Sequence, residues 1–185
     1  MSTDLFRVSC FGPENRLSLR RPPSWRTSGN RSCQRTHTLV KGLIAGAAGT
    51  SALNAAAYLD MAIRARSASS TPQQAVDKLA DLAQVDLGDG QRTDNRKEAL
   101  GALLGYGTGA GAAVCYGLLT SGMRPSWRVG VPVLTGLALI GSDGPLTALG
   151  VTDPRQWSAS AWISDVIPHL AYGITAYVAY ELLRS

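Results

Sequence analysis

ALGALLGYGTGAGAAVCYGLLTSGM, residues 99–123, is a stretch of this chain without a single Asp, Glu, Lys or Arg. An α-helix rises about 1.5 Å per residue, so a helix over this stretch is longer than the roughly 30 Å of a bilayer's hydrocarbon core. A surface helix of a soluble protein carries charged residues on one face, whereas this stretch carries none on any face. Residues 99–123 therefore predict a transmembrane helix.

Three further windows are almost as free of charge. Each holds one charged residue: 39–59 has Lys41, 129–152 has Asp143, and 156–180 has Asp165. The charged residues, 17% of a chain of 185, are concentrated between these windows, although the mean composition resembles that of a small basic soluble protein. The predicted fold class is all-α, an integral membrane four-helix bundle with spans at about 39–59, 99–123, 129–150 and 158–182.

The links between the later spans set their relative directions. Residues 124–128 and 153–155 are short, so consecutive spans are antiparallel and the predicted order is up-down-up-down. Lys and Arg are more numerous on the side that carries both termini, which predicts that both termini are cytoplasmic. Trp residues lie near the edges of the spans, where an indole prefers the headgroup layer; they are Trp127, Trp157 and Trp162. We expect a multi-pass protein of the cell membrane, with the lipid bilayer as its partner.

The segment before the first span differs in composition from the rest. Residues 1–38 carry seven Arg and no periodic apolar pattern, and their own charge equals the formal net charge of +5 of the whole chain. They predict a disordered basic head that precedes a bundle over 39–185 and holds the first span on the cytoplasmic side. No nucleic-acid partner is expected, although a basic tail that touches nucleic acid or anionic lipid is an alternative. The same composition also allows a later start near Leu39, or a signal peptide cleaved near residues 55–57.

The long first loop, residues 60–98, contains signals for a short amphipathic helix. Thr71 suits the cap position, Pro72 the first helical position, Gln74 completes a capping-box spacing, and Gly88 suits the stop. The polar side of this helix is acidic, so anionic lipid would repel it. We expect the apolar stripe to dock on the end of the bundle.

Small residues recur at every fourth position of the second span. They are Gly101, Gly105, Gly109, Ala113 and Gly117. Residues four apart stack on one face of a helix, so this pattern predicts a groove along which another helix packs closely. The first span offers Gly42 and Gly46 as the matching surface. The pattern is specific for helix packing and not for a function.

Two sequence motifs in the same stretch have functional readings that their surroundings oppose. The glycines of residues 105–111 are not preceded by a strand, as a dinucleotide-binding loop requires. The Gly-Tyr-Gly triplet at 105–107 follows two leucines, whereas a potassium-channel filter is a re-entrant loop with a preceding Thr-Val.

Polar and ionisable residues of the spans gather at one end in an up-down-up-down path. The candidate cluster is Asn54, Asp60, Asp143, Asp165 and His169, with Glu98 at the same end. Asp165 and His169 are four apart and can pair, and Pro168 and Pro145 predict kinks or breaks beside them. Such residues are costly in a membrane, so they either tie spans together or line a cavity that passes a proton or small polar solute.

The sequence shows no constellation for enzyme chemistry. No nucleophile lies next to a base, and one His with scattered Asp residues is not a metal-ligand motif. The cysteines, Cys10, Cys33 and Cys115, have neither paired nor CxxC spacing. We expect no catalytic residue, no metal and no cofactor.

Several segments carry a family resemblance. They are KGLIAG at 41–46, YLDM at 58–61, ASSTP at 68–72, TALGVTDP at 147–154 and SDVIPHLAYG at 164–173. Through them the chain resembles a group of uncharacterised actinobacterial small multi-pass membrane proteins. The resemblance implies a membrane location and no established activity. The expected function is a structural or interaction role, alone as a homo-oligomer or with another membrane protein; the alternative is the proton or solute pathway.

Overall fold

The fold is all-α, as the sequence predicts. The computed structural model describes residues 25–185, with side chains from residue 35 onward. Over that range it contains no strand, and its helices are α1 (Trp25–Arg64), α2 (Thr71–Ala83), α3 (Gln91–Leu119), α4 (Trp127–Ala148) and α5 (Ala159–Leu182), with a short 3₁₀ helix at Pro154–Gln156.

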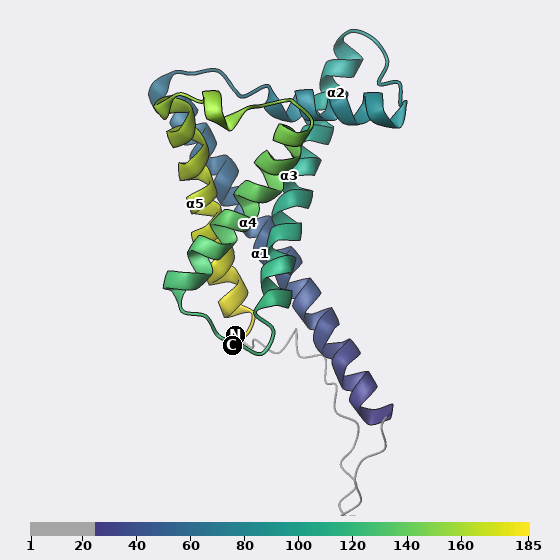
Figure 1. The fold of residues 1–185 in the computed structure, drawn as a ribbon, viewed down its shortest axis with the longest axis vertical. Helices are drawn as coiled ribbons and strands as arrows, with labels where there is room; N and C mark the ends of the chain where they lie inside the picture. The colour runs from purple at the N-terminus through teal and green to yellow at the C-terminus, as the bar shows by residue number, and fades with distance from the viewer. Residues whose placement is uncertain (1–24) are drawn as a thin grey trace, which may run out of the picture.

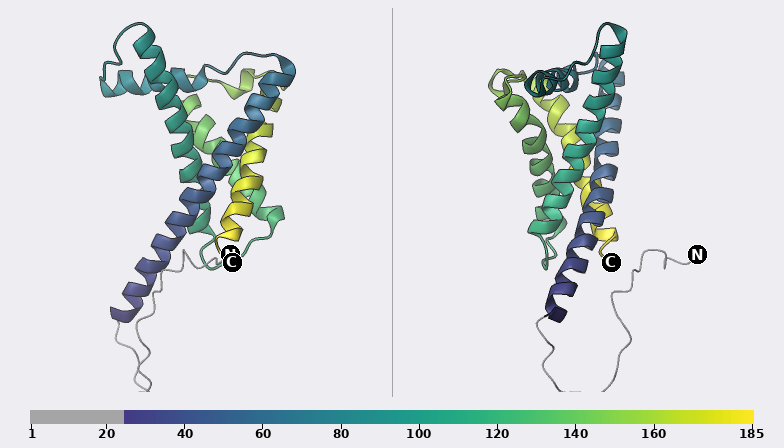
Figure 2. Two further views of the ribbon diagram at one scale, coloured as in Figure 1. Left: turned by 180° about the vertical axis from the view of Figure 1, so that it is seen from behind. Right: turned by 90° about the vertical axis from the view of Figure 1, so that its right-hand side faces the viewer.

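The four long helices form an antiparallel bundle (Figure 1). Helix α1 makes its most extensive contacts with α5 and α3, and α4 packs on α5 and α3. The helices therefore follow one another around the bundle in chain order, which is the up-down-up-down arrangement. Helix α2 packs on α3, at the end of the bundle where α1 and α4 finish and α3 and α5 begin (Figure 2). We call this the α2 end.

Two of the helices are long and apolar enough to cross a membrane. They are α3 and α4, which contain most of the predicted spans at 99–123 and 129–150. Helices α1 and α5 fall short of the same hydropathy, although they contain the predicted spans at 39–59 and 158–182. The reason is that a window almost without charge is not necessarily apolar. Lys41, Asn54 and the Gly, Ser and Thr residues lower the mean hydropathy of α1, and Asp165 with the Pro, His and Tyr residues lowers that of α5.

The first helix is longer than its predicted span. Residues 25–38, predicted to be disordered, are helical and belong to the 40-residue helix α1. Residues 1–24, the rest of the predicted head, lie outside the described residues. A helix that is already nucleated gains one hydrogen bond for each residue it adds, and no proline interrupts the chain between Pro23 and Pro72. The extension of α1 over residues 25–38 therefore does not depend on burial of one face of the helix.

Tyrosine rings fill the centre of the bundle. Tyr116, Tyr172 and Leu134 are completely buried. Tyr172 of α5 reaches across the bundle, and its hydroxyl donates a 2.6 Å hydrogen bond to the Gly109 carbonyl of α3. A Cβ atom at Gly109 would lie 3.1 Å from the Tyr172 ring, and one at Gly117 would lie 3.0 Å from the Tyr180 ring. The absent side chains of α3 thus leave the space that the tyrosines of α5 occupy.

Helix α1 meets α3 closely at two of its glycines. A Cβ atom at Gly42 would lie 2.7 Å from Val114 Cα, and one at Gly46 would lie 2.5 Å from Ala110 Cα. Both distances are shorter than carbon atoms tolerate, so only glycine allows α1 this close to α3. Ala113 is buried in the same core. In helix association of this kind, close contact of backbones supplies the dispersion attraction.

The groove does not run the whole length of α3, in contrast to the prediction. Gly105 is exposed, with open space where its side chain would be, and Gly101 packs against Pro72 of α2 instead of another long helix. Helices α1 and α3 cross as an X (Figure 1), and crossing helices touch over a few turns only. The small residues of α3 therefore contact α2 at one end of the helix, and α1 and α5 further along it.

The boundaries of α2 also differ in detail from the sequence prediction. Its N-cap residue is Ser70, not Thr71, and the side chain of Gln74 donates a 2.8 Å hydrogen bond to the Ser70 hydroxyl. The helix ends at Ala83, before Gly88 is reached, and its C-cap residue Gln84 adopts the left-handed conformation with φ 54°. The exposed Gln84 provides the left-handed turn that glycine usually provides at a helix end.

Alanine substitutions at two glycines of the stripe test this packing. We expect Gly46→Ala to lower the free energy of unfolding by about 1–3 kcal/mol, because α1 and α3 must separate to admit the methyl group. Gly105→Ala is the matched control and should be neutral or stabilising by up to about 1 kcal/mol, since alanine favours helix and has room. Thermal unfolding of the purified variants, followed by circular dichroism, measures both. Equal losses at the two positions would contradict the assigned crossing.

Candidate functional site

A buried histidine joins α4 and α5 near the α2 end. His169 is 8% exposed, and its Nε2 atom lies 3.2 Å from the Ser142 hydroxyl of α4. Its Nδ1 atom lies 2.8 Å from the backbone carbonyl of Asp165, one turn earlier in α5. Both helices stay helical here, through Pro145 in α4 and Pro168 in α5, so the predicted broken helix end is not observed.

The hydrogen-bond partners of His169 restrict how it is protonated. A carbonyl only accepts, so Nδ1 carries a hydrogen. The Ser142 hydroxyl has one hydrogen, which it donates either to the Ala138 carbonyl, 3.0 Å away, or to Nε2 of His169. In the first case Nε2 must donate to the Ser142 oxygen and the ring is cationic; in the second the ring is neutral. The two arrangements differ in the direction in which the Ser142 hydroxyl points.

Two carboxyl groups flank this histidine. The Asp165 Oδ1 atom lies 3.5 Å from Nδ1, the distance of an ion pair when the ring is charged. The other carboxyl oxygen of Asp165, Oδ2, is buried, and the side chains of Asp165 and Asp143 share a hydrogen bond. Asp143, which follows Ser142 in α4, interacts electrostatically with both Asp165 and His169. The predicted residues Asp143, Asp165 and His169 thus come together.

Asp60 belongs to a second cluster, which ties α1 to α5. Its carboxylate pairs with Arg66 Nε at 2.6 Å and with Arg64 Nε at 2.9 Å, and it accepts a 3.3 Å hydrogen bond from the Ser164 hydroxyl of α5. Arg64 also donates to Ser164 and, at 3.0 Å, to Ser160. We call Asp60, Arg64, Arg66, Ser160 and Ser164 the Asp60 clasp. Because Arg64 and Asp60 both form hydrogen bonds with serines of α5, the clasp joins the end of α1 to the start of α5.

The charge on Asp60 is favoured by these partners. The hydrogen bond from Arg66 lowers the pKa of the Asp60 carboxyl below its usual range, and the positive charges of Arg64 and Arg66 act in the same direction. The side chain of Asp60 is 17% exposed, so the pair is partly shielded from water. Its contribution depends on the carboxyl being ionised.

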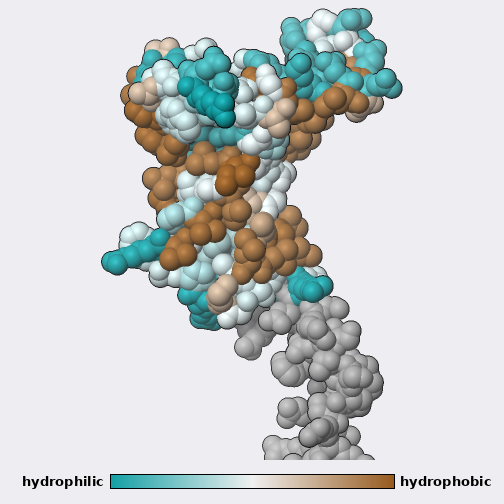
Figure 3. All heavy atoms as spheres, viewed as in Figure 1, coloured by the Kyte–Doolittle hydropathy of each residue, from teal (hydrophilic) through white to brown (hydrophobic). Residues whose placement is uncertain are grey.

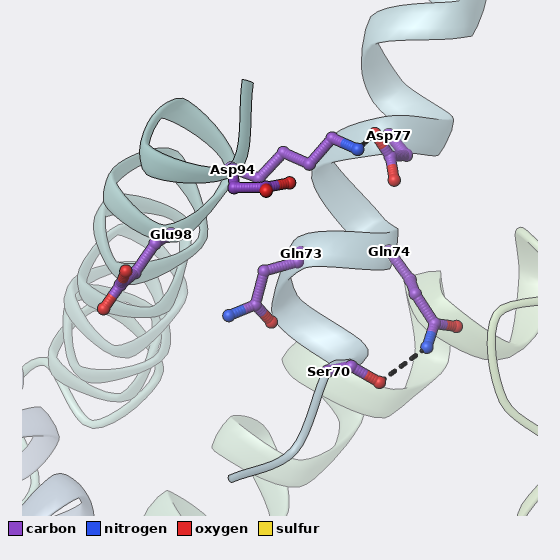
Figure 4. Close-up of a pocket in the computed structure, with 7 residues that line it drawn as sticks. Ser70, Gln73, Gln74, Asp77, Asp94 and Glu98 are labelled. Atoms are coloured by element: carbon purple, nitrogen blue, oxygen red, sulfur yellow. Dashed lines mark hydrogen bonds and ion pairs between the residues drawn. The ribbon is translucent and has the colours of Figure 1, made fainter. Parts of the chain in front are cut away.

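Two residues predicted at this end join neither cluster. Asn54 is half-buried in α1 and makes none of these contacts. Glu98 lies at the start of α3 and lines a separate pocket of about 340 Å³ between α2 and α3 (Figure 4). The predicted single cluster is therefore divided, because the helices that carry it diverge at the α2 end.

The pocket between α2 and α3 is polar and open. It is lined by Ser70, Gln73, Gln74, Asp77, Asp94, Lys97 and Glu98. Lys97 of α3 pairs with Asp77 of α2 at 2.7 Å, and this hydrogen bond raises the pKa of Lys97. The side chains in Figure 4 come from two helices that the Lys97–Asp77 pair holds together, so the pocket is the junction of α2 with the bundle.

Several residues of these sites were missed by the sequence prediction. Arg64 and Arg66 lie outside the windows of low charge, and Ser142, Ser160 and Ser164 lie inside them with no partner predicted. A usable signal was the spacing of Asp60 and Arg64, which are four apart and pair on one helix face. The contacts to α5 are separated by about a hundred residues in sequence and had no local signal.

The chemistry available at these sites is proton transfer and charge pairing. Among the residues that the structure describes, no group of three or more His, Cys, Asp or Glu side chains is placed to hold a metal ion. Comparisons of the chain with protein-family models, curated proteins and solved structures give no match. The resemblance to actinobacterial membrane proteins remains a prediction.

The Asp60 clasp predicts a loss of stability in acid. A carboxyl whose pKa is lower in the folded state than its unfolded value near 3.9 stabilises the fold fully above that value and loses the effect as the pH falls through the folded pKa. We expect the melting temperature of the protein to fall below about pH 4, and Asp60→Asn to melt earlier at neutral pH with a flatter acid dependence. Melting curves between pH 7 and pH 3 measure both; parallel pH profiles for the two proteins would contradict the clasp.

Proposed function

We propose that this chain is a multi-pass membrane protein in which α1, α3, α4 and α5 all cross the bilayer, and that its role is structural or interactive. One observation carries the proposal: large aliphatic side chains lie on the outside of the bundle, while small and polar side chains lie inside. A soluble protein has the opposite distribution. Lipid is as apolar as leucine, so in a membrane bundle the aliphatic residues face outward and small residues form the helix contacts.

Helix α5 shows this distribution most clearly. Its outward residues are Ile163, Val166, Ile167, Leu170, Ile174 and Val178, all of them exposed. Its buried residues are Pro168, His169, Tyr172, Gly173, Ala176 and Tyr180. The residues that lower the hydropathy of α5 thus face the bundle, and the face available to lipid is aliphatic. The aliphatic outer face supports a span at α5, although the average hydropathy of the helix does not.

The two most apolar helices are exposed in the same way. Only 28% of the apolar window of α3 and 22% of that of α4 is buried within the bundle, whereas the core helix of a soluble protein is mostly buried. Figure 3 shows hydrophobic surface over the middle of the bundle and hydrophilic surface toward both ends. Water would have to cover a large continuous apolar area, which soluble monomers avoid.

Aromatic residues support the placement of the bilayer. Trp127 begins α4 and is exposed, and the pair Trp157 and Trp162, with ring centroids 5.0 Å apart, lies at the start of α5 at the opposite end. Indole rings favour the headgroup layer of a membrane. The 22 residues of α4 measure about 33 Å, which matches the hydrocarbon core between two such layers.

The topology of the full chain tests this proposal. Single cysteines replace Ala68, Ser121, Gln156 and Ser185 in a chain whose own cysteines are changed to alanine, and an impermeant maleimide labels them in sealed membrane vesicles of known orientation. Four spans place residues 68 and 156 on one side, and 121 and 185 on the other. If only α3 and α4 crossed, residue 185 would label with 68 and 156. That result would overturn the four-span proposal.

The filled interior favours a structural role over a solute channel. Tyr116, Tyr172 and Leu134 occupy the centre and have no exposed surface. The α2–α3 pocket and a pocket of about 440 Å³ on α3, lined by Leu100, Leu103, Leu104, Gly107 and Thr108, both lie away from this centre. A small polar solute would have no path between the rings.

A proton pathway is the second candidate, and the hydrogen bonding of His169 favours it. Its partners Ser142 and Asp165 allow both protonation states of the ring, and a proton needs no open pore. Further along the interior, the buried hydroxyls of Thr135 and Tyr116 have no hydrogen-bond partner among the described residues. Buried hydroxyls of this kind bind water in many proteins, and such waters extend a proton relay.

Proton flux into liposomes tests this second candidate. If it holds, the reconstituted protein should acidify the lumen faster than empty vesicles do, and His169→Ala and Asp165→Asn should remove that excess while their melting temperatures stay close to that of the parent. Asn54→Ala, at the same end but outside the cluster, is the matched control and should keep the flux. A parent flux no greater than that of empty vesicles would overturn the proton pathway and leave the structural role.

A further inference from the structure

We propose that α2 is an interfacial helix, whose C-terminal half lies on the membrane surface at the α2 end with its apolar side in the boundary between headgroups and acyl chains. The inference depends on the proposed membrane location of the bundle and adds a lipid-binding surface to it. The occupant of this surface is a leaflet of zwitterionic lipid.

The apolar stripe of α2 has two halves with different surroundings. In the N-terminal half, Ala75 and Val76 are buried against α3. Leu79 and Leu82 continue the stripe along the same face at helical spacing, but they are 41% and 70% exposed. The stripe thus extends beyond the edge of α3, and no part of the described chain covers its second half.

The direction of α2 suits a membrane surface. The helix lies across the bundle axis, lengthwise in Figure 1 and nearly end-on in the right-hand view of Figure 2. In Figure 3 the underside of this region, toward the middle of the bundle, is hydrophobic and its upper side is hydrophilic. An amphipathic helix that binds in the interface has this orientation, with its axis in the membrane plane.

The height of α2 is set by its contacts with α3. Pro72 packs on Gly101, where a Cβ atom would lie 3.0 Å from the proline ring, and Lys97 pairs with Asp77. Gly101 lies just inside the start of the uncharged stretch 99–123, and Lys97 lies just outside it. The helix is therefore level with the point where α3 leaves the hydrocarbon core. Its apolar underside is continuous with the apolar surface of the bundle.

The charges of α2 select the kind of lipid. Its polar side carries Asp77 and Asp81 against Lys78, and Asp86 follows in the next turn of chain. Helices that bind anionic leaflets carry clusters of Lys and Arg, which this one lacks. The attraction therefore comes from Leu79 and Leu82, and zwitterionic headgroups are the surface that the acidic side tolerates.

Fluorescence quenching in reconstituted full-length protein tests this inference. An environment-sensitive dye is attached to a single cysteine at Leu82, at Asp81 on the polar side, or at Leu103 on the exposed face of α3, and the protein is placed in phosphatidylcholine vesicles. Lipid-bound nitroxide should quench the dye at 82 at least about threefold more than the dye at 81, and iodide should do the reverse, because only residue 82 faces the acyl boundary. Replacing half of the phosphatidylcholine with phosphatidylglycerol should reduce the difference.

The dye at Leu103 separates the two proposals. If it is quenched by lipid nitroxide and the dyes at 82 and 81 behave alike, the bundle is in the membrane and the interfacial helix is overturned. If the dye at 103 is open to iodide, the membrane location itself fails. If the dye at 82 is shielded from both quenchers, and the shielding decreases when the protein is diluted in lipid, a second copy of the chain covers the stripe, which also overturns the proposal.

Discussion

The contact between Gly46 of α1 and the backbone of α3 at Ala110 is the constraint on which the bundle depends. Because neither helix has a side chain between them there, the two axes approach closely, and this approach sets the distance that the other two helices must bridge. Tyr172 of α5 is long enough to do so: it packs on Gly49 and Gly109 and ends its hydroxyl on the Gly109 carbonyl. A larger residue at Gly46 or Gly109 would change both contacts together.

The polar groups have a consistent place in this arrangement. Two polar groups lie toward the α2 end. The Asp60 clasp lies between α1 and α5, and His169 with its partners Ser142, Asp143 and Asp165 lies between α4 and α5. Each joins α5 to a neighbour where the helices diverge and aliphatic packing is weaker. In a low-dielectric setting a paired charge or a satisfied imidazole fixes one geometry, since the unpaired groups would be costly. The same cost explains why such groups also serve as sites for proton transfer.

The exposed surface of the bundle has the opposite composition to its small and polar interior. The aliphatic residues that a soluble protein would bury lie outside, and the helix hydropathies average two opposite faces. The C-terminal half of α2, which extends beyond α3, continues the apolar surface sideways. It does so at the level where the uncharged stretch 99–123 of α3 begins. The molecule thus has an apolar band with an amphipathic helix at its edge, which is the form expected of a bundle that spans the bilayer and rests one short helix on the membrane surface.

The sequence by itself determined the all-α fold, the alternation of the long helices, the short helix in the first loop and the close-packing glycines Gly42, Gly46 and Gly109, because helix periodicity, link length and absence of a side chain are local properties. It did not show that residues 25–38 are helical, that Gly105 lies in the open or that Asp60 and His169 belong to different clusters. Those outcomes depend on where straight helices cross and diverge. Arg64 meets Ser164 only because α1 and α5 lie side by side at the α2 end, and such proximity of distant residues arises from tertiary packing alone.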